Sequence, residues 1–194
     1  MPDSHVVEGA IDRFITECRA ICESHADPAD TVLAIAPLMK QLLGGDKSFL
    51  RAEHFRCNAD HYTRNAIYIA DDESLSLYAL VWLPGQWTPV HDHGSWGVVG
   101  VVQGILEERS FISCDGEIHC DSGIRLKRGG VILLDHGSVT TFVPNPDHIH
   151  MTGVAPNRER VVSLHLYGRN MNSFHVYDVP AGTRRLIDVP HQKS

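Results

Sequence analysis

The chain has 194 residues, of which 43% are hydrophobic and 7% aromatic, enough to build the core of one ordinary globular domain. Its 17 Lys and Arg against 24 Asp and Glu give a formal net charge of −7. No basic block indicates binding to nucleic acid or to an anionic membrane. Apolar runs such as 98–102 are too short to cross a bilayer, and the first residues do not resemble a signal peptide. With an odd number of cysteines, five, we expect a cytoplasmic protein.

Residues 1–55 are predicted to form a helical arm. Apolar residues recur at intervals of three and four over 6–22, and a second apolar stripe covers 32–43. Pro28, which follows an Asp at the expected N-cap, marks the start of the second helix. Pro37 is expected to divide this second stripe into two short helices.

Residues 56–194 show a different pattern, in which short segments rich in β-branched and aromatic residues alternate with turns. The turn signals include Pro84-Gly85, Asp115-Gly116 and Gly129-Gly130. This pattern predicts a double-sheet β-barrel, with the helical arm packed on it within a single structural domain. The segments expected as strands are 62–69, 75–82, 95–103, 105–112, 131–134, 139–143, 160–167 and 174–178.

The most unusual count is 13 histidines, two of which form the pair His91-Asp92-His93. On a strand, positions i and i+2 point to the same side, so both imidazoles can face one interior point. Gly85 lies six residues before His91, and Gly104 lies eleven after His93. This frame resembles the first motif of cupins, which are jelly-roll barrels that hold a metal inside.

A typical cupin carries a Glu ligand four residues after the second His, and this chain has Gly97 there. The pattern therefore predicts a metal site of three imidazoles. The third comes from the second half of the barrel, where either His148 or His150 is the ligand. Three neutral imidazoles leave a divalent metal its full charge and an open face, which suits an incoming thiolate and a gas molecule.

Two further features carry polar groups whose environment the pattern alone leaves open. Ser163, His165 and Tyr167 alternate with leucines, so they share one face of a predicted strand. They form either a hydrogen-bonded chain inside the barrel or a solvent-exposed polar face. Arg64, near the start of the first strand, is either an interior clamp for a carboxylate or a solvated residue of an edge strand.

Taken in order, these motifs resemble the cysteine dioxygenase family of cupins. The resemblance extends from about residue 62 to residue 178. It is carried by Tyr62-Thr63-Arg64-Asn65, Trp82-x2-Gly85-x5-His91-Asp92-His93, Gln103-Gly104, an isolated His, and Ser163-Leu164-His165-Leu166-Tyr167. It implies a mainly β fold, the cupin double-stranded β-helix, behind an N-terminal α-helical arm.

The resemblance also implies a metal and its ligands. In the family the third iron ligand lies thirteen residues before the Ser of the Ser-His-Tyr set, which selects His150 over His148. Fe(II) is then expected on His91, His93 and His150. Gly97 stands where animal members carry a Cys cross-linked to the active-site Tyr, so that cross-link cannot form here.

For the substrate, the resemblance implies that Arg64 binds a carboxylate with support from Tyr62. It makes Tyr167 an active-site residue backed by His165 and Ser163. The expected reaction takes a small thiol and O2 to a sulfinic acid.

L-cysteine is the first choice among thiols, because relatives that oxidise 3-mercaptopropionate usually carry Gln where this chain has Arg64. 3-Mercaptopropionate and mercaptosuccinate remain alternatives, and Arg169 is a candidate second carboxylate clamp. A non-redox metal cupin, acting as an isomerase or lyase, and a ligand-binding cupin are the alternatives of other classes. We expect a monomer or small homo-oligomer that binds neither nucleic acid nor membrane.

Overall fold

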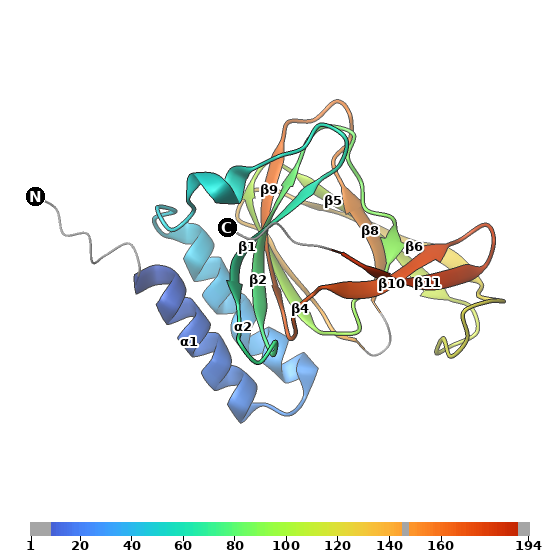
Figure 1. Ribbon diagram of the computed structural model, residues 1–194, viewed down its shortest axis with the longest axis horizontal. Helices are drawn as coiled ribbons and strands as arrows, with labels where there is room; N and C mark the ends of the chain where they lie inside the picture. Colours follow the sequence, from blue (N-terminus) through green and yellow to red (C-terminus); the bar gives the residue numbers. More distant parts are fainter. Residues whose placement is uncertain (1–8, 145–147, 190–194) are drawn as a thin grey trace, which may run out of the picture.

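The computed structural model, which describes residues 9–144 and 148–189, contains two helices followed by two facing antiparallel sheets (Figure 1). The helical segments are α1 (Gly9–Ser24), α2 (Pro28–Gly44) and the short 3-10 helix η1 (Ala52–Phe55). The five-stranded sheet has the order β1 (Thr63–Ile69), β2 (Ser76–Trp82), β9 (Val161–Tyr167), β4 (Gly97–Gln103), β7 (Val139–Phe142). The six-stranded sheet has the order β11 (Thr183–Asp188), β10 (Ser173–Asp178), β3 (Val90–His91), β8 (Ile149–Gly153), β5 (Leu106–Ser113), β6 (Leu126–Leu134). The double-stranded β-helix behind a helical arm is therefore confirmed.

Helix α2 is one continuous helix, so the expected division at Pro37 is wrong. Its start is as predicted, because the side chain of Asp27 accepts a hydrogen bond from the Ala29 amide at 2.8 Å. Pro37 removes the amide that would bond to the carbonyl of Leu33. Both residues lie on the exposed side of the helix, with Leu33 67% exposed, so water can satisfy that carbonyl. The first part of the predicted stripe of α1, residues 6–8, lies outside the described residues.

The helices cover the outer face of the five-stranded sheet (Figure 1). Strand β2 alternates accordingly: Leu77 and Val81 pack with the helices, whereas Tyr78 and Trp82 point into the barrel. Gly100 on β4 permits the close approach of α2, because a Cβ at this position would lie 2.8 Å from a methyl carbon of Leu43. With both of its faces covered, every residue of β2 and of β9 is buried.

The six-stranded sheet differs from the sequence prediction at the Gly129-Gly130 pair, which was expected to be a turn. Both glycines lie inside β6, opposite Ser110 of β5, where the strand register shifts. The Ser110 hydroxyl accepts from the Gly130 amide at 2.8 Å, and a Cβ on Gly129 would lie 2.5 Å from that hydroxyl oxygen. The two glycines therefore form a β-bulge, and a side chain at Gly129 would require the Ser110 hydroxyl to move.

Three strands were not predicted, namely β3, β8 and β11. Strand β3 has two residues and β8 has five, so neither is long enough to show a clear alternation of apolar and polar residues. Both strands nevertheless carry candidate metal ligands.

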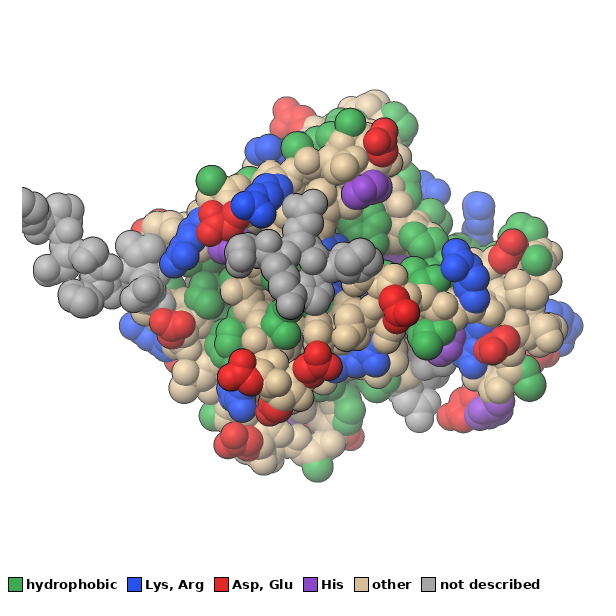
Figure 2. All heavy atoms as spheres, viewed as in Figure 1, with side chains coloured by type: hydrophobic (Ala, Val, Ile, Leu, Met, Phe, Trp, Pro, Cys, Tyr) green, Lys and Arg blue, Asp and Glu red, His purple; other side chains and the backbone are tan. Residues whose placement is uncertain are grey.

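The surface shows no concentration of one charge on the face seen in Figure 2, where acidic and basic side chains are interspersed. Among the described residues, no helix combines the length and the apolar character that crossing a membrane requires. The clearest apolar exposure is on the edge strand β6, where Val131, Ile132 and Leu133 are each about half exposed or more.

Candidate active site

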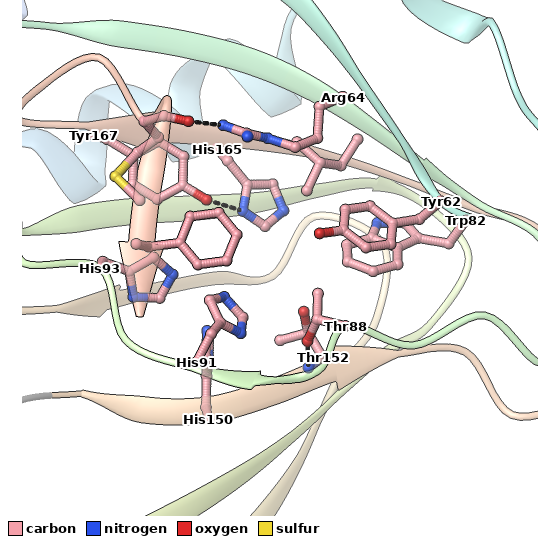
Figure 3. A pocket seen from close by; sticks show the side chains of 13 residues that line it. Tyr62, Arg64, Trp82, Thr88, His91, His93, His150, Thr152, His165 and Tyr167 are labelled. Atoms are coloured by element: carbon pink, nitrogen blue, oxygen red, sulfur yellow. Dashed lines mark hydrogen bonds between the residues drawn. The ribbon is translucent and has the colours of Figure 1, made fainter. Parts of the chain in front are cut away.

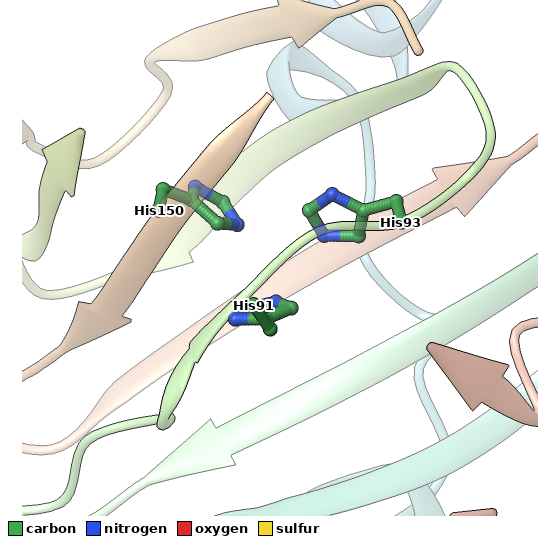
Figure 4. A group of neighbouring side chains, drawn as sticks. All are labelled: His91, His93 and His150. Atoms are coloured by element: carbon green, nitrogen blue, oxygen red, sulfur yellow. The ribbon is translucent and has the colours of Figure 1, made fainter. Parts of the chain in front are cut away.

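Three histidines meet inside the barrel. His91 is the last residue of β3, His93 lies two residues further along, and His150 on β8 is paired directly with His91 across the sheet. One ring nitrogen from each comes within 4.8 Å of the other two (Figure 4). All three side chains are buried, with exposed fractions of 6%, 4% and 3%. Of the two candidates for the third position, the structure brings His150 to the pair.

The electrostatics of the cluster favour neutral imidazoles, the form that binds metals. Burial lowers the pKa of His91 and of His93 well below the usual value, and the neighbouring histidines lower both further. Nδ1 of His91 bonds to the carbonyl of Pro89 at 3.0 Å, which leaves its Nε2 for a metal. Nδ1 of His93 is buried and has no hydrogen-bond partner among the described residues. A buried, unpaired nitrogen in a three-imidazole cluster fits a divalent metal.

Glu108 on β5 supports the third histidine. Its carboxylate lies 3.4 Å from Nδ1 of His150 and 3.1 Å from Nε2 of His148. Burial alone would raise the pKa of Glu108, but its hydrogen bonds with His148 and His150 lower it below the usual range. An ionised carboxylate that holds the far nitrogen of a metal ligand fixes the ring orientation and tautomer. His148 therefore contacts the cluster through Glu108, outside the group of three.

Within residues 9–144 and 148–189, no carboxylate joins His91 and His93 in the cluster. Asp92 faces the other way, where it accepts hydrogen bonds from the Tyr177 hydroxyl at 2.8 Å and the His175 amide at 3.2 Å. At the usual position of the cupin Glu, a Cβ on Gly97 would lie 2.3 Å from the ring of Phe142. That ring stacks on His93 with its centroid 4.3 Å away. Phe142 thus occupies the space that a longer residue at position 97 would need.

Arg64 from β1 points into the same pocket as the three imidazoles (Figure 3). It is 8% exposed, its Nη2 donates to the carbonyl of Met171, and its guanidinium lies 4.7 Å from the ring centre of Tyr78. Its Nη1 is buried and has no hydrogen-bond partner among the described residues. Tyr62 lines the pocket beside it and stacks on Trp82 at 4.5 Å. The interpretation of Arg64 as a solvated residue is wrong, although β1 is an edge strand.

Ser163, His165 and Tyr167 lie in series on the inner face of β9, which excludes the solvent-exposed alternative. The Ser163 hydroxyl is 2.9 Å from Nε2 of His165. Nδ1 of His165 is 3.2 Å from the Tyr167 hydroxyl (Figure 3). Nε1 of Trp82 donates to the Ser163 oxygen at 3.0 Å. Burial, together with the nearby His150 and Arg64, lowers the pKa of His165 to about 3. Burial also raises the pKa of Tyr167 above its usual range.

Arg169 is the predicted site residue that the structure does not bring to the pocket. Its guanidinium donates to the backbone carbonyl of Ser173 instead. The sequence places Arg169 in a Gly-Arg-Asn turn but did not predict its hydrogen bond to Ser173.

Sequence reasoning assigned no role to Glu108, nor to the donor Trp82. Leu106 and Glu108 lie two residues apart and so share one face of β5. The apolar Leu106, which is fully buried, was the available signal that Glu108 faces the interior as well.

Comparison with protein families decides the relationship that this geometry suggests. The family model described as cysteine dioxygenase type I matches residues 48–180. The chain belongs to the cysteine dioxygenase type I family. The match includes β1, both histidine-bearing segments and β9, so every pocket-lining residue described above lies within it.

Solved structures that resemble this cysteine dioxygenase family member are distant in sequence. A protein with a double-stranded β-helix domain from Klebsiella pneumoniae is 14% identical over 75% of this chain and 100% of its own, with a TM-score of 0.46. An RmlC-like cupin from Ralstonia eutropha is 12% identical over 74% of this chain and 76% of its own, with a TM-score of 0.47. A cupin-like protein from Thermotoga maritima is 18% identical over 74% and 90%, with a TM-score of 0.40.

Proposed function

We propose that the chain is an Fe(II) thiol dioxygenase that converts a small carboxylate-bearing thiol and O2 to the sulfinic acid, with L-cysteine as the first-choice substrate. Family membership supports the reaction class. The observation that carries the substrate class is Nη1 of Arg64, a buried cationic donor without a partner among the described residues, in the pocket of the three histidines. A substrate carboxylate would satisfy that donor through a charge-assisted hydrogen bond.

His91, His93 and His150 would hold the iron, since their neutral nitrogens and the absence of a carboxylate among them suit a divalent ion with an open face. Bound Fe(II) would supply a site for thiolate coordination and the electrons that O2 activation needs. Arg64 contributes orientation, because its bond to the carbonyl of Met171 fixes the guanidinium before substrate arrives.

Tyr167 acts as a neutral hydrogen-bond donor toward the substrate. Trp82 can only donate, so it occupies one lone pair of the Ser163 oxygen. We assign the Ser163 hydroxyl as donor to Nε2 of His165, and Nδ1–H of His165 as donor to the Tyr167 oxygen. With the His165 bond accepted at its oxygen, the Tyr167 proton is free to point into the pocket. The raised pKa of Tyr167 keeps that proton in place at neutral pH.

The experiment is a sulfinate assay on protein purified without oxygen and loaded with Fe(II). Cysteine, 3-mercaptopropionate, mercaptosuccinate and cysteamine are supplied in turn while O2 uptake and products are measured. We expect cysteine to give the highest kcat/KM, because it offers an amine as well as a thiolate to the open metal face. A higher value for 3-mercaptopropionate or mercaptosuccinate would overturn the choice of cysteine. If no thiol consumes O2, the dioxygenase proposal itself fails, and a non-redox or ligand-binding cupin becomes the better interpretation.

A further inference from the structure

A second cluster of ligand atoms lies behind the three-imidazole group and shares one histidine with it. It consists of the Glu108 carboxylate, Nε2 of His148 and Nδ1 of His150. The two imidazole nitrogens lie 3.1 Å apart, and each faces its own oxygen of the carboxylate. Nε2 of His148 is 3.1 Å from Oε1 of Glu108, and Nδ1 of His150 is 3.4 Å from Oε2.

These distances match the edges of a metal coordination tetrahedron. Bonds of about 2.0–2.1 Å from Zn²⁺ to nitrogen or oxygen place neighbouring ligands about 3.3 Å apart. Hydrogen bonding accounts for the short contact between the two nitrogens less well. If each nitrogen donates to its own carboxylate oxygen, neither accepts from the other, and the 3.1 Å contact between them holds no hydrogen bond. A cation between the two rings and the carboxylate would bind the lone pairs of both nitrogens and of a carboxylate oxygen at once.

Charge and access also favour a cation at this point. Glu108 is 4% exposed, and within the described part of the chain its ion-pair partners are His148 and His150, with no Lys or Arg. A buried carboxylate without a permanent positive partner is costly unless it is paired or coordinates a metal. His148, whose side chain is 26% exposed, opens the cluster toward solvent and leaves room for a water as fourth ligand.

We propose that Glu108, His148 and His150 form a second divalent-cation site, of the Zn²⁺ class, distinct from the site of the three histidines. Two imidazoles and one carboxylate are a donor set typical of Zn²⁺. The site itself does not depend on the proposed dioxygenase function.

Sharing His150 makes the two sites mutually exclusive. A neutral imidazole has one nitrogen with a free lone pair and one that carries a proton. When Nε2 of His150 binds a metal with His91 and His93, its Nδ1–H faces Glu108. When Nδ1 binds a metal with Glu108 and His148, Nε2 carries the proton and is lost to the first site. A cation at the second site therefore removes one ligand from the first, which would make it an inhibitor.

The test uses Co²⁺ as the probe, because its visible absorption reports tetrahedral coordination directly. A His91→Ala/His93→Ala double variant retains Glu108, His148 and His150, and we expect it to bind one Co²⁺ per chain with a tetrahedral spectrum. Adding either Glu108→Gln or His148→Ala should weaken this binding at least about tenfold. The matched control is Glu107→Gln, which removes the neighbouring carboxylate that pairs with Arg109 instead.

No Co²⁺ binding by the double variant, or binding that survives His148→Ala, would overturn the second site and leave Glu108 and His148 as a hydrogen-bonded support of His150. His148→Ala keeps this test usable should Glu108→Gln impair folding, since His148 is partly exposed. Wild-type protein tests the exclusion separately. Saturation at one Co²⁺ per chain is expected, and saturation at two would overturn mutual exclusion. None of these measurements involves turnover, so they stand apart from the thiol assay.

Discussion

The two sheets position their functional groups by different means. The five-stranded sheet is covered by helices on one side and by the barrel interior on the other, so His165 and Tyr167 sit on a strand whose every residue is buried. The six-stranded sheet supplies the metal ligands from the two-residue strand β3, from the segment after it and from the five-residue strand β8. The carbonyl of Pro89 and the carboxylate of Glu108 accept from His91 and His150 and so orient the two rings.

Substitutions on the two sheets should therefore affect different properties. Packing against a continuous core fixes the residues that would bind substrate and donate a proton, Arg64 and Tyr167. Substitutions there should alter turnover while the metal stays bound. The metal side depends on individual hydrogen bonds and on the ion, so substitutions there should alter metal content first. The predictions below test that separation, beginning with the largest expected effect.

Replacing His91 by Ala should abolish sulfinate formation and remove iron from the site of the three histidines. The cluster contains three nitrogens and no carboxylate, so the loss of one leaves two ligands, too few for a stable site. Iron per chain and sulfinate production measure the result. His119→Ala, which removes a histidine whose side chain is 77% exposed, serves as the control. Sulfinate formation by His91→Ala, or iron retained at one per chain in His91→Ala/His148→Ala, which also removes a ligand of the proposed second site, would show that the catalytic metal lies elsewhere.

Arg64→Ala should lower kcat/KM for cysteine by about 30-fold to several thousand-fold while iron content stays constant. Loss of a buried charge-assisted pair costs roughly 2–5 kcal/mol. Turnover of cysteamine, which lacks a carboxylate, should be spared if that thiol reacts at all. Arg169→Ala provides the comparison, because Arg169 bonds to Ser173 outside the pocket and should change kcat/KM little. Equal losses for cysteine and cysteamine would argue against a carboxylate clamp.

His91 and Arg64 also show how much of the site could be predicted from the sequence alone. The alternation on β9 predicted which side chains share its inner face, because side-chain direction on a strand follows from its period of two. The His-x-His spacing predicted that both imidazoles face one point, and they do, although His93 lies beyond the end of β3. The fold could be predicted because short segments rich in β-branched and aromatic residues alternate with turn signals. The burial of Arg64 could not, since β1 is an edge strand and the segment that carries Met171, which covers the guanidinium, comes from a distant part of the chain.

Contacts between strands that are distant in the sequence could not be predicted either, because they depend on how the strands pair. Glu108 meets His150 because β5 and β8 pair in one register, and nothing local to either strand encodes that register. Gly129-Gly130 was misassigned because glycine pairs are typical of turns, and the requirement for glycine here comes from Ser110 on the neighbouring strand.

Glu108→Gln should weaken Fe(II) binding by about 10- to 100-fold, the usual effect of losing a carboxylate behind a ligating histidine. The amide keeps the size of the side chain but cannot offer the same charge to Nδ1 of His150. A competition titration against a chelator gives the affinity. With iron in excess, kcat should return close to the wild-type value. A reduced kcat at full iron occupancy would indicate that Glu108 acts on the chemistry as well.

Tyr167→Phe should lower kcat by about tenfold or more while iron remains bound, a size expected for one positioned proton donor. The ring is kept, so packing in the buried pocket is preserved. Steady-state kinetics at full iron occupancy separate kcat from KM. An unchanged kcat with a raised KM would assign Tyr167 to binding alone.

The last prediction concerns the free energy of unfolding, which should depend on pH through the buried His165. In the folded protein burial lowers the pKa of His165 to about 3, from an ordinary value of 6.5. Below pH 6.5 the unfolded chain therefore binds a proton at this position that the folded protein refuses. The stability that neutral His165 contributes is fully present above pH 6.5 and is lost as the pH falls toward 3, by at most about 1.4 kcal/mol per pH unit.

Urea unfolding of the metal-free protein between pH 7 and pH 4 measures how the free energy of unfolding changes with pH, and His165→Gln should reduce this slope. Because the other buried histidines titrate in both proteins, only the difference between the two slopes reports on His165. Identical slopes would mean that His165 binds its proton equally well in the folded protein and the unfolded chain.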